Sequence, residues 1–142
     1  MKVKSLTPIL NVSDLPASFA WFAALGWNRL WDYGNPPTFG AVGCGDCEIF
    51  LCRDAQGARG GNPPRFKGDD DTGAVWMSWW LETPADVDAA HALALQLGYT
   101  VTLPPTDEPW GVRECHIRHP DGHTFRVGAA LDCAPEKGAA KD

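Results

Sequence analysis

The chain carries one pattern twice at a spacing of 72 residues, and this repeat limits the fold more than any other feature of the sequence. Asp14 and Asp86 each open a helical stretch, and Leu-Gly followed by an aromatic residue closes it at 25–27 and at 97–99. Asp is a favoured helix N-cap, and Gly readily takes the left-handed conformation that ends a helix. A strand-like run precedes each helix and further strand-like runs follow it. The sequence therefore predicts two βαβββ modules of an α+β protein.

The two modules are expected at residues 1–52 and 74–130, within one structural domain. Residues 53–73 are rich in Gly and Pro and predict an exposed connector, and residues 131–142 predict a flexible tail. A chain of 142 residues that is 44% hydrophobic can bury one substantial core but is short for two ordinary domains. We therefore expect the two modules to be parts of one unit.

The composition argues against several classes of partner. The formal net charge is −6, whereas binding to nucleic acid depends on clustered Lys and Arg. No apolar run approaches the roughly 20 residues that span a bilayer, and the first ten residues lack the features of a secretion signal. Five cysteines in irregular spacing fit a reducing compartment better than a disulfide framework. The chain is expected to be cytoplasmic, without nucleic-acid or membrane partners.

Alternation along each expected strand assigns one face to the helices and leaves the other face open. In the run at 75–82, Met77 and Trp79 belong to the helix side, and Trp76, Ser78 and Trp80 to the open side. The same alternation puts five further side chains on the open side, with Trp110 at its edge: Glu48, Phe50, Glu114, His116 and Arg126. Two such modules would leave their open faces free to form a shared concave surface.

Three histidines lie in the segment 110–127, which consists of two alternating runs joined by a His-Pro-Asp-Gly turn. His119 and His123 flank the tight turn, and this spacing favours turn residues over metal ligands. His116 is expected on the open side, where it is better read as a polar contact than as a catalytic base.

Five motifs in order along the chain carry a resemblance to a known family: Thr7 to Asp14 (TPILNVSD), Trp21 to Trp27 (WFAALGW), Gly45-Asp46, Trp110 to Glu114 (WGVRE) and Pro120 to His123 (PDGH). With them the chain resembles the vicinal oxygen chelate superfamily, which includes glyoxalase I, extradiol dioxygenases, fosfomycin-modifying enzymes and bleomycin resistance proteins. The resemblance implies an eight-stranded, mixed, U-shaped sheet with the helices on its outer face, often completed in a homodimer.

Family enzymes hold a divalent metal ion with His or Glu on the first, fourth, fifth and eighth strands. The resemblance carries these places onto Thr7, Phe50, Ser78 and Arg126. None of the four is a normal ligand, since Phe has no donor atom and Arg keeps a positive charge. We therefore expect neither a metal ion nor any other cofactor.

Without these metal ligands, the chain is similar to the bleomycin resistance subgroup, whose members bind a drug in crevices at a dimer interface and do not catalyse a reaction. The expected function is sequestration of a planar, cationic antibiotic of the bleomycin type, with aromatic rings for stacking and carboxylates that select positive charge. The expected ligand-binding residues are Trp76, Trp80, Trp110, Glu48, Phe50, Ser78, Glu114, His116 and Arg126.

Two alternatives from other classes stay open. One is a metal-dependent lyase or isomerase of the glyoxalase type, with metal ligands at other positions than those carried over. The other is a metal-free enzyme in which His116 and Glu114 act as acid and base.

Overall fold

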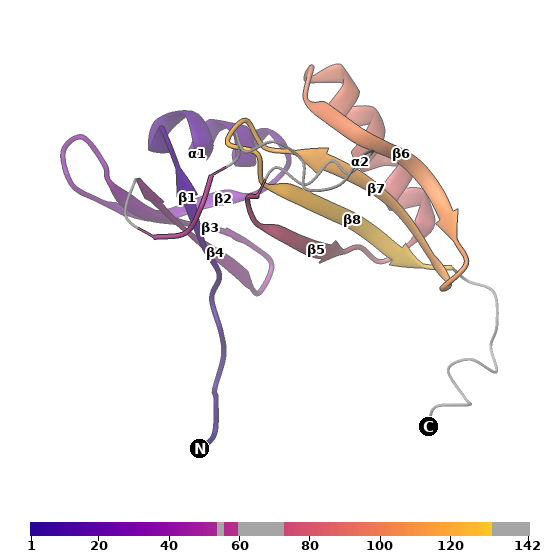
Figure 1. The fold of residues 1–142 in the computed structure, drawn as a ribbon, viewed down its shortest axis with the longest axis horizontal. Coiled ribbons are helices and arrows are strands. Elements are labelled where there is room, and N and C mark those ends of the chain that lie inside the picture. Colours follow the sequence, from indigo (N-terminus) through magenta and orange to yellow (C-terminus); the bar gives the residue numbers. More distant parts are fainter. Residues whose placement is uncertain (54–55, 60–72, 132–142) are drawn as a thin grey trace. The chain divides into compact units, whose positions relative to one another are not determined.

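The computed structural model describes residues 1–53, 56–59 and 73–131. Most of the expected connector, including the acidic run Asp69 to Asp71, and the tail from residue 132 onward lie outside the described residues. The elements follow the expected order of two βαβββ modules (Figure 1): β1 Ile9–Val12, α1 Leu15–Ala24, β2 Asn28–Tyr33, β3 Phe39–Cys44, β4 Cys47–Arg53, β5 Trp76–Trp80, α2 Pro84–Gln96, β6 Thr100–Glu108, β7 Val112–Arg118 and β8 Thr124–Ala130.

Each module forms its own four-stranded mixed sheet. The strand orders are β1-β4-β3-β2 and β5-β8-β7-β6. In each sheet the first and last strands of the module pair in parallel, and the other neighbours are antiparallel. The α+β class and the two modules are thus confirmed. None of the helices in the described part of the chain is long and apolar enough to cross a membrane.

The chain divides into two compact units that do not coincide fully with the modules. Among the described residues, unit 1 comprises those up to residue 75 together with 120–123, and unit 2 comprises 76–119 and 124–131. The turn between β7 and β8 therefore belongs to unit 1, although both strands belong to unit 2. The prediction of a single structural domain stays a prediction.

The predicted N-cap is confirmed for α1, whereas α2 begins earlier than predicted. Asp14 is the N-cap of α1, and its side chain accepts a hydrogen bond from the backbone N–H of Ala17 at 3.0 Å. In α2 the N-cap is Thr83, and Asp86 occupies the third helical position. Each of these two side chains accepts a hydrogen bond from the other residue's backbone N–H, which forms a capping box. Pro84 starts this helix early because its fixed φ suits the first turn.

The helices cover one face of each sheet, as the alternation predicts. In unit 1, α1 packs against β2, β3 and β4, and in unit 2, α2 packs against β6, β7 and β8 (Figure 1). Trp79 stacks on the buried Phe125 with ring centroids 4.3 Å apart. Trp27 is buried in the core of unit 1 against Phe22. The buried apolar side chains of the two cores include Leu10, Val12, Phe19, Phe22, Ile49 and Leu51 in unit 1, and Val87, Ala94, Ile117, Phe125 and Val127 in unit 2.

Alternation before the first helix predicts a strand with Leu6 on the helix side, and the observed strand is shorter. The alternating run begins at Val3, but β1 begins at Ile9, and the preceding residues leave the sheet as an extended segment (Figure 1). Leu6 shares the alternation of the buried Leu10 and Val12, yet it is 83% exposed. Alternation alone does not supply the neighbouring strand that a β-strand needs.

Two glycines on β3 offer a test of the packing between α1 and the sheet. A Cβ added at Gly40 would lie 2.6 Å from Phe19 Cζ and 2.8 Å from the Trp31 carbonyl oxygen. We expect Gly40→Ala to lower the free energy of unfolding by about 1–3 kcal/mol, measured by urea denaturation, because backbone cannot move aside cheaply. Gly43→Ala is the control, since its close neighbours are the methyl groups of the exposed Leu30. An equal loss in both variants would contradict this account.

Candidate functional site

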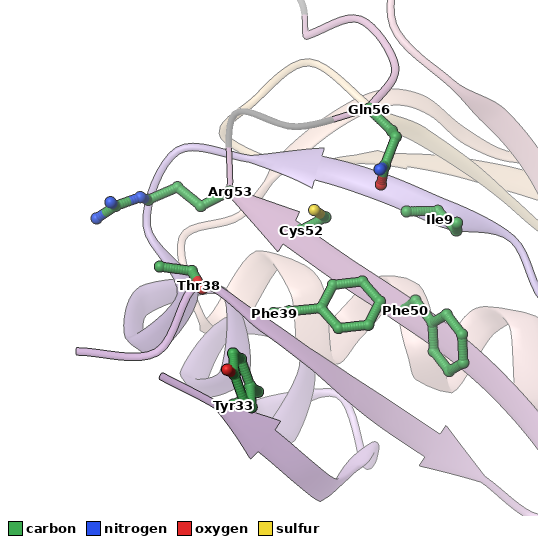
Figure 2. Close-up of a pocket in the computed structure, with 8 residues that line it drawn as sticks. All are labelled: Ile9, Tyr33, Thr38, Phe39, Phe50, Cys52, Arg53 and Gln56. Carbon is green, nitrogen blue, oxygen red and sulfur yellow. The ribbon is translucent and has the colours of Figure 1, made fainter. Parts of the chain in front are cut away.

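The open face of the unit 1 sheet carries a hollow of about 480 Å³ (Figure 2). The rings of Phe39 and Phe50 lie side by side in it, and the guanidinium of Arg53 extends away from them (Figure 2). The hollow is lined by Ile9, Tyr33, Thr38, Phe39, Phe50, Cys52, Arg53 and Gln56. Its lining is thus mainly apolar with a few polar groups at the margin, as in many small-molecule sites.

Three aromatic rings form a cluster on this face, which we call the aromatic trio: Trp31, Phe39 and Phe50. Their ring centroids are 5.3–5.4 Å apart in every pair, in tilted and edge-on geometry. The strand register explains the cluster, because Ala41 of β3 lies between Phe50 of β4 and Trp31 of β2. The small Ala side chain lets the two large rings meet above it. Trp31 remains 38% exposed, so the trio is open to a ligand.

Sequence reasoning found only Phe50 among the three. Phe39 and Trp31 are not among the expected ligand-binding residues. The available signal was that both are aromatic residues in strand-like runs. Their meeting with Phe50 depends on the register between three strands, which local alternation does not supply. Glu48 precedes Phe50 by two residues on β4 and is half-buried on the same face.

The open face of unit 2 carries the charged part of the expected site. A hydrogen-bonded group, which we call the Glu114 network, joins three of the expected residues. Arg126 Nη2 donates to Glu114 Oε1 at 2.7 Å, and His116 Nε2 lies 2.8 Å from Glu114 Oε2. In register, Arg126 of β8 lies between Ser78 of β5 and His116 of β7. The structure thus brings Ser78, Glu114, His116 and Arg126 together.

Glu114 is only 3% exposed, and burial by itself raises the pKa of a carboxyl group. The hydrogen bonds from Arg126 and His116 outweigh burial and hold the pKa of Glu114 below its ordinary value. Glu114 is therefore an ionised carboxylate whose two oxygens are already engaged. This changes the role that the sequence suggested, because a cationic ligand would have to displace Arg126 to reach it.

The three expected tryptophans of unit 2 are all exposed. Trp76 and Trp80 lie with Ser78 on the open side of β5, and Trp80 is 66% exposed. The Trp76 ring meets the His116 ring edge-on, with centroids 5.4 Å apart. Trp110 lies in the turn between β6 and β7. Exposed indoles of this kind offer stacking surfaces for planar ligands.

The four places of the family metal do not fit a divalent ion. Phe50 belongs to the aromatic trio, and the guanidinium of Arg126 is hydrogen-bonded to Glu114. Ser78 is the register partner of Arg126, and Thr7 precedes β1. Two of the four thus offer no lone pair to a cation. Within the described ranges, no group of three or more His, Cys, Asp or Glu side chains gathers in a way that would hold a metal ion.

The other two histidines of the hairpin are buried, His119 in unit 2 and His123 in unit 1. His123 Nδ1 accepts a hydrogen bond from the Val75 N–H at 3.2 Å, and Nε2 donates to the Asn11 carbonyl at 2.8 Å. In the same turn, Asp121 Oδ2 accepts from the Ser13 N–H at 2.8 Å. Only a neutral imidazole can make both His123 bonds. Burial lowers the pKa of His123, outweighing the bond to Asn11 that raises it.

These bonds predict a pH dependence of stability. The pKa of His123 is lower in the folded chain than the ordinary 6.5, so the unfolded chain binds the proton more readily. The His123 contribution is complete above pH 6.5 and is lost as the pH falls from 6.5 towards the folded value. We expect His123→Ala to lower the free energy of unfolding by about 1–3 kcal/mol at pH 7.5 and to flatten its pH dependence, measured by urea denaturation.

The half-buried His91 of α2 supplies the control. His91→Ala leaves His123 in place, so it should keep the loss of stability below pH 6.5. A His123→Ala variant with the pH dependence of the wild type would show that this imidazole is not the titrating group.

Comparisons with known proteins agree with the fold. The family model for the Glyoxalase/Bleomycin resistance protein/Dioxygenase superfamily matches residues 3–127. A search of curated protein sequences found no match.

Several solved structures share the fold at low sequence identity. TioX from Micromonospora sp. ML1 is 17% identical, with a TM-score of 0.70 over 91% of this chain and 100% of its own. Lactoylglutathione lyase from Agrobacterium tumefaciens is 19% identical, with a TM-score of 0.69 over 91% of this chain and 96% of its own. A bleomycin resistance determinant encoded on the transposon Tn5 is 16% identical, with a TM-score of 0.65 over 92% of this chain and 100% of its own.

Proposed function

Because the chain belongs to the Glyoxalase/Bleomycin resistance protein/Dioxygenase superfamily, we propose that it binds a planar small molecule on its open sheet faces without a metal ion. The specific ligand proposed is an antibiotic of the bleomycin type, which the protein would sequester in the cytoplasm. One of the structures that share the fold is a bleomycin resistance determinant, and another is a lyase, so the choice depends on the site itself.

The observation that supports binding is the aromatic trio. Trp31, Phe39 and Phe50 stand on the face that α1 does not cover, beside a hollow of about 480 Å³. A planar ligand placed on these rings would gain about 0.5–1.5 kcal/mol for each stacked pair beyond the burial of apolar area. For a cationic ligand, Glu48 is the carboxylate next to the trio on β4.

A homodimer is part of the proposal. Trp80, Trp110 and Tyr33 are large hydrophobic side chains that the chain leaves exposed. A second copy of the chain would cover part of this surface and turn the open faces into crevices. Sedimentation analysis of the purified protein is expected to show a dimer, and a monomer at micromolar concentration would contradict this part of the proposal.

The side chains at the expected metal positions argue against a metal-dependent lyase. Phe50 and Arg126 replace two ligands, and neither can coordinate a divalent ion. Metal analysis of the purified protein is the direct test. Stoichiometric zinc, nickel, iron or manganese bound to the protein would overturn the metal-free proposal.

A metal-free enzyme is the second candidate, and one observation favours it. Glu114 engages His116 Nε2 at 2.8 Å, and a carboxylate in this position orients an imidazole for proton transfer through its other nitrogen. The side chain of His116 is 14% exposed. Turnover of a small carbonyl substrate that is lost in His116→Ala would favour this candidate over sequestration.

The binding proposal is tested by tryptophan-fluorescence titration with bleomycin. We expect quenching that saturates at one ligand per subunit. Phe50→Ala should weaken binding about tenfold, the equivalent of roughly 1.4 kcal/mol, because it removes one ring of the trio. Leu95→Ala is the control, since Leu95 is an exposed residue of α2. A flat response, or equal affinity of the Phe50→Ala variant and the wild type, would contradict the proposed ligand or its site.

A further inference from the structure

We propose that Arg126, positioned by Glu114 and flanked by His116 and Ser78, binds a carboxylate group of the planar ligand on the open face of β5, β8 and β7. The inference rests on the proposed function, because it assigns a chemical group to the planar ligand whose binding that function requires. The sequence predicts that the unit 2 part of the site selects a cationic ligand group, whereas this inference assigns it an anionic group.

The exposed charges on the open face of unit 2 decide which charge a ligand group must carry to bind there. Three register rows of the sheet centre on Arg126: Trp76-Thr124-Arg118-Thr100, Ser78-Arg126-His116-Leu103 and Trp80-Gly128-Glu114-Thr106. The charged residues in these rows are two arginines and one glutamate. The side chain of Glu114 is 4% exposed, whereas that of Arg126 is 37% exposed. An incoming ligand therefore meets the guanidinium before it meets the carboxylate.

The Arg126 guanidinium keeps free donors. Within the described part of the chain, its hydrogen bond is the one from Nη2 to Glu114 Oε1. A guanidinium has several N–H groups in a planar fork that matches the two oxygens of a carboxylate. Ser78 is exposed beside it on β5 and adds a hydroxyl donor. Arg126 can thus hold Glu114 and a ligand carboxylate at the same time.

Glu114 positions this donor set. Its two oxygens engage Arg126 and His116 at 2.7 and 2.8 Å, so both side chains are oriented before a ligand arrives. A preoriented group loses less conformational entropy on binding. The Glu114 carboxylate also neutralises part of the Arg126 charge, which weakens the attraction of simple anions. A carboxylate that accepts two parallel hydrogen bonds from the guanidinium is therefore favoured over a simple counterion.

The ring of the ligand can contact an indole next to the position of its carboxylate. Trp76 and Trp80 lie on either side of Ser78 along β5, each roughly 7 Å from it, as alternate residues of a strand are. Both indoles are exposed on the open side. The arrangement fits a planar aromatic carboxylate whose ring contacts an indole while its carboxylate meets Arg126.

Three matched probes test the proposal: 2-naphthoate, 2-naphthamide and the 2-naphthylmethylammonium ion, titrated by calorimetry into the full chain. They share the ring and differ in charge. The wild type is expected to bind 2-naphthoate at least fivefold more tightly than the amide, and the ammonium ion most weakly. Arg126→Gln should weaken binding of 2-naphthoate about tenfold and leave the amide unchanged.

Arg113→Gln is the matched control. It removes the same charge from the same sheet, but Arg113 is bonded to Asp88 of α2 and to Asp107 of β6, on the helix side. It should keep the preference for the carboxylate. Because Arg126→Gln leaves the buried Glu114 without its guanidinium partner, the double variant Arg126→Gln/Glu114→Gln serves as a second form that carries no unpaired carboxylate. It should also lose the preference.

The outcomes separate the two proposals. Equal affinity of the wild type for 2-naphthoate and 2-naphthamide, or a preference that survives in both Arg126 variants, would overturn the carboxylate site and leave ring binding intact. Failure of all three probes to bind the folded wild type would count against ring binding and against the carboxylate site together.

Discussion

A single amphipathic helix can cover only one face of a four-stranded sheet, and each unit of this protein has one such helix in the part that the structure describes. Burial of the covered face fixes the register of strands that carry buried side chains, such as β4 and β8, because a slip by one residue would move these side chains to the other side. The uncovered face is then free to hold residues that serve a ligand. Both candidate regions lie on such faces, the aromatic trio in unit 1 and the Glu114 network in unit 2.

The two open faces differ in how their side chains satisfy one another. In unit 1, large rings meet across the small Ala41, and dispersion and burial hold them together. In unit 2, a buried carboxylate requires charged or hydrogen-bonding partners, and Arg126 and His116 supply them. Arg126, onto which the family resemblance carries a metal-ligand place, is thus the hydrogen-bond partner of Glu114. A cation in this place would have to compete with a guanidinium that is already bonded.

Several site residues could be predicted because they depend on local periodicity. Alternation along β5 and β7 correctly put Ser78 and His116 on the open side and Trp79 on the helix side. The same local rule was wrong for Leu6, because it has no means of showing whether a neighbouring strand is present. It also put the start of α2 at Asp86, although Thr83 and Pro84 start the helix earlier. The trio of Trp31, Phe39 and Phe50 went unpredicted, since it joins residues from three strands.

The sequence by itself determined the repeat, the order of the elements, the covered and open faces, and the presence at positions 50 and 126 of Phe and Arg, which cannot coordinate a divalent ion. These follow from the period of the backbone and from the chemistry of single side chains. Only the tertiary structure decided which open-face residues meet. Register brings Phe50 and Trp31 to either side of Ala41, and it puts Arg126 against Glu114. Contacts between strands depend on pairing across long separations in the chain, and no local pattern contains that information.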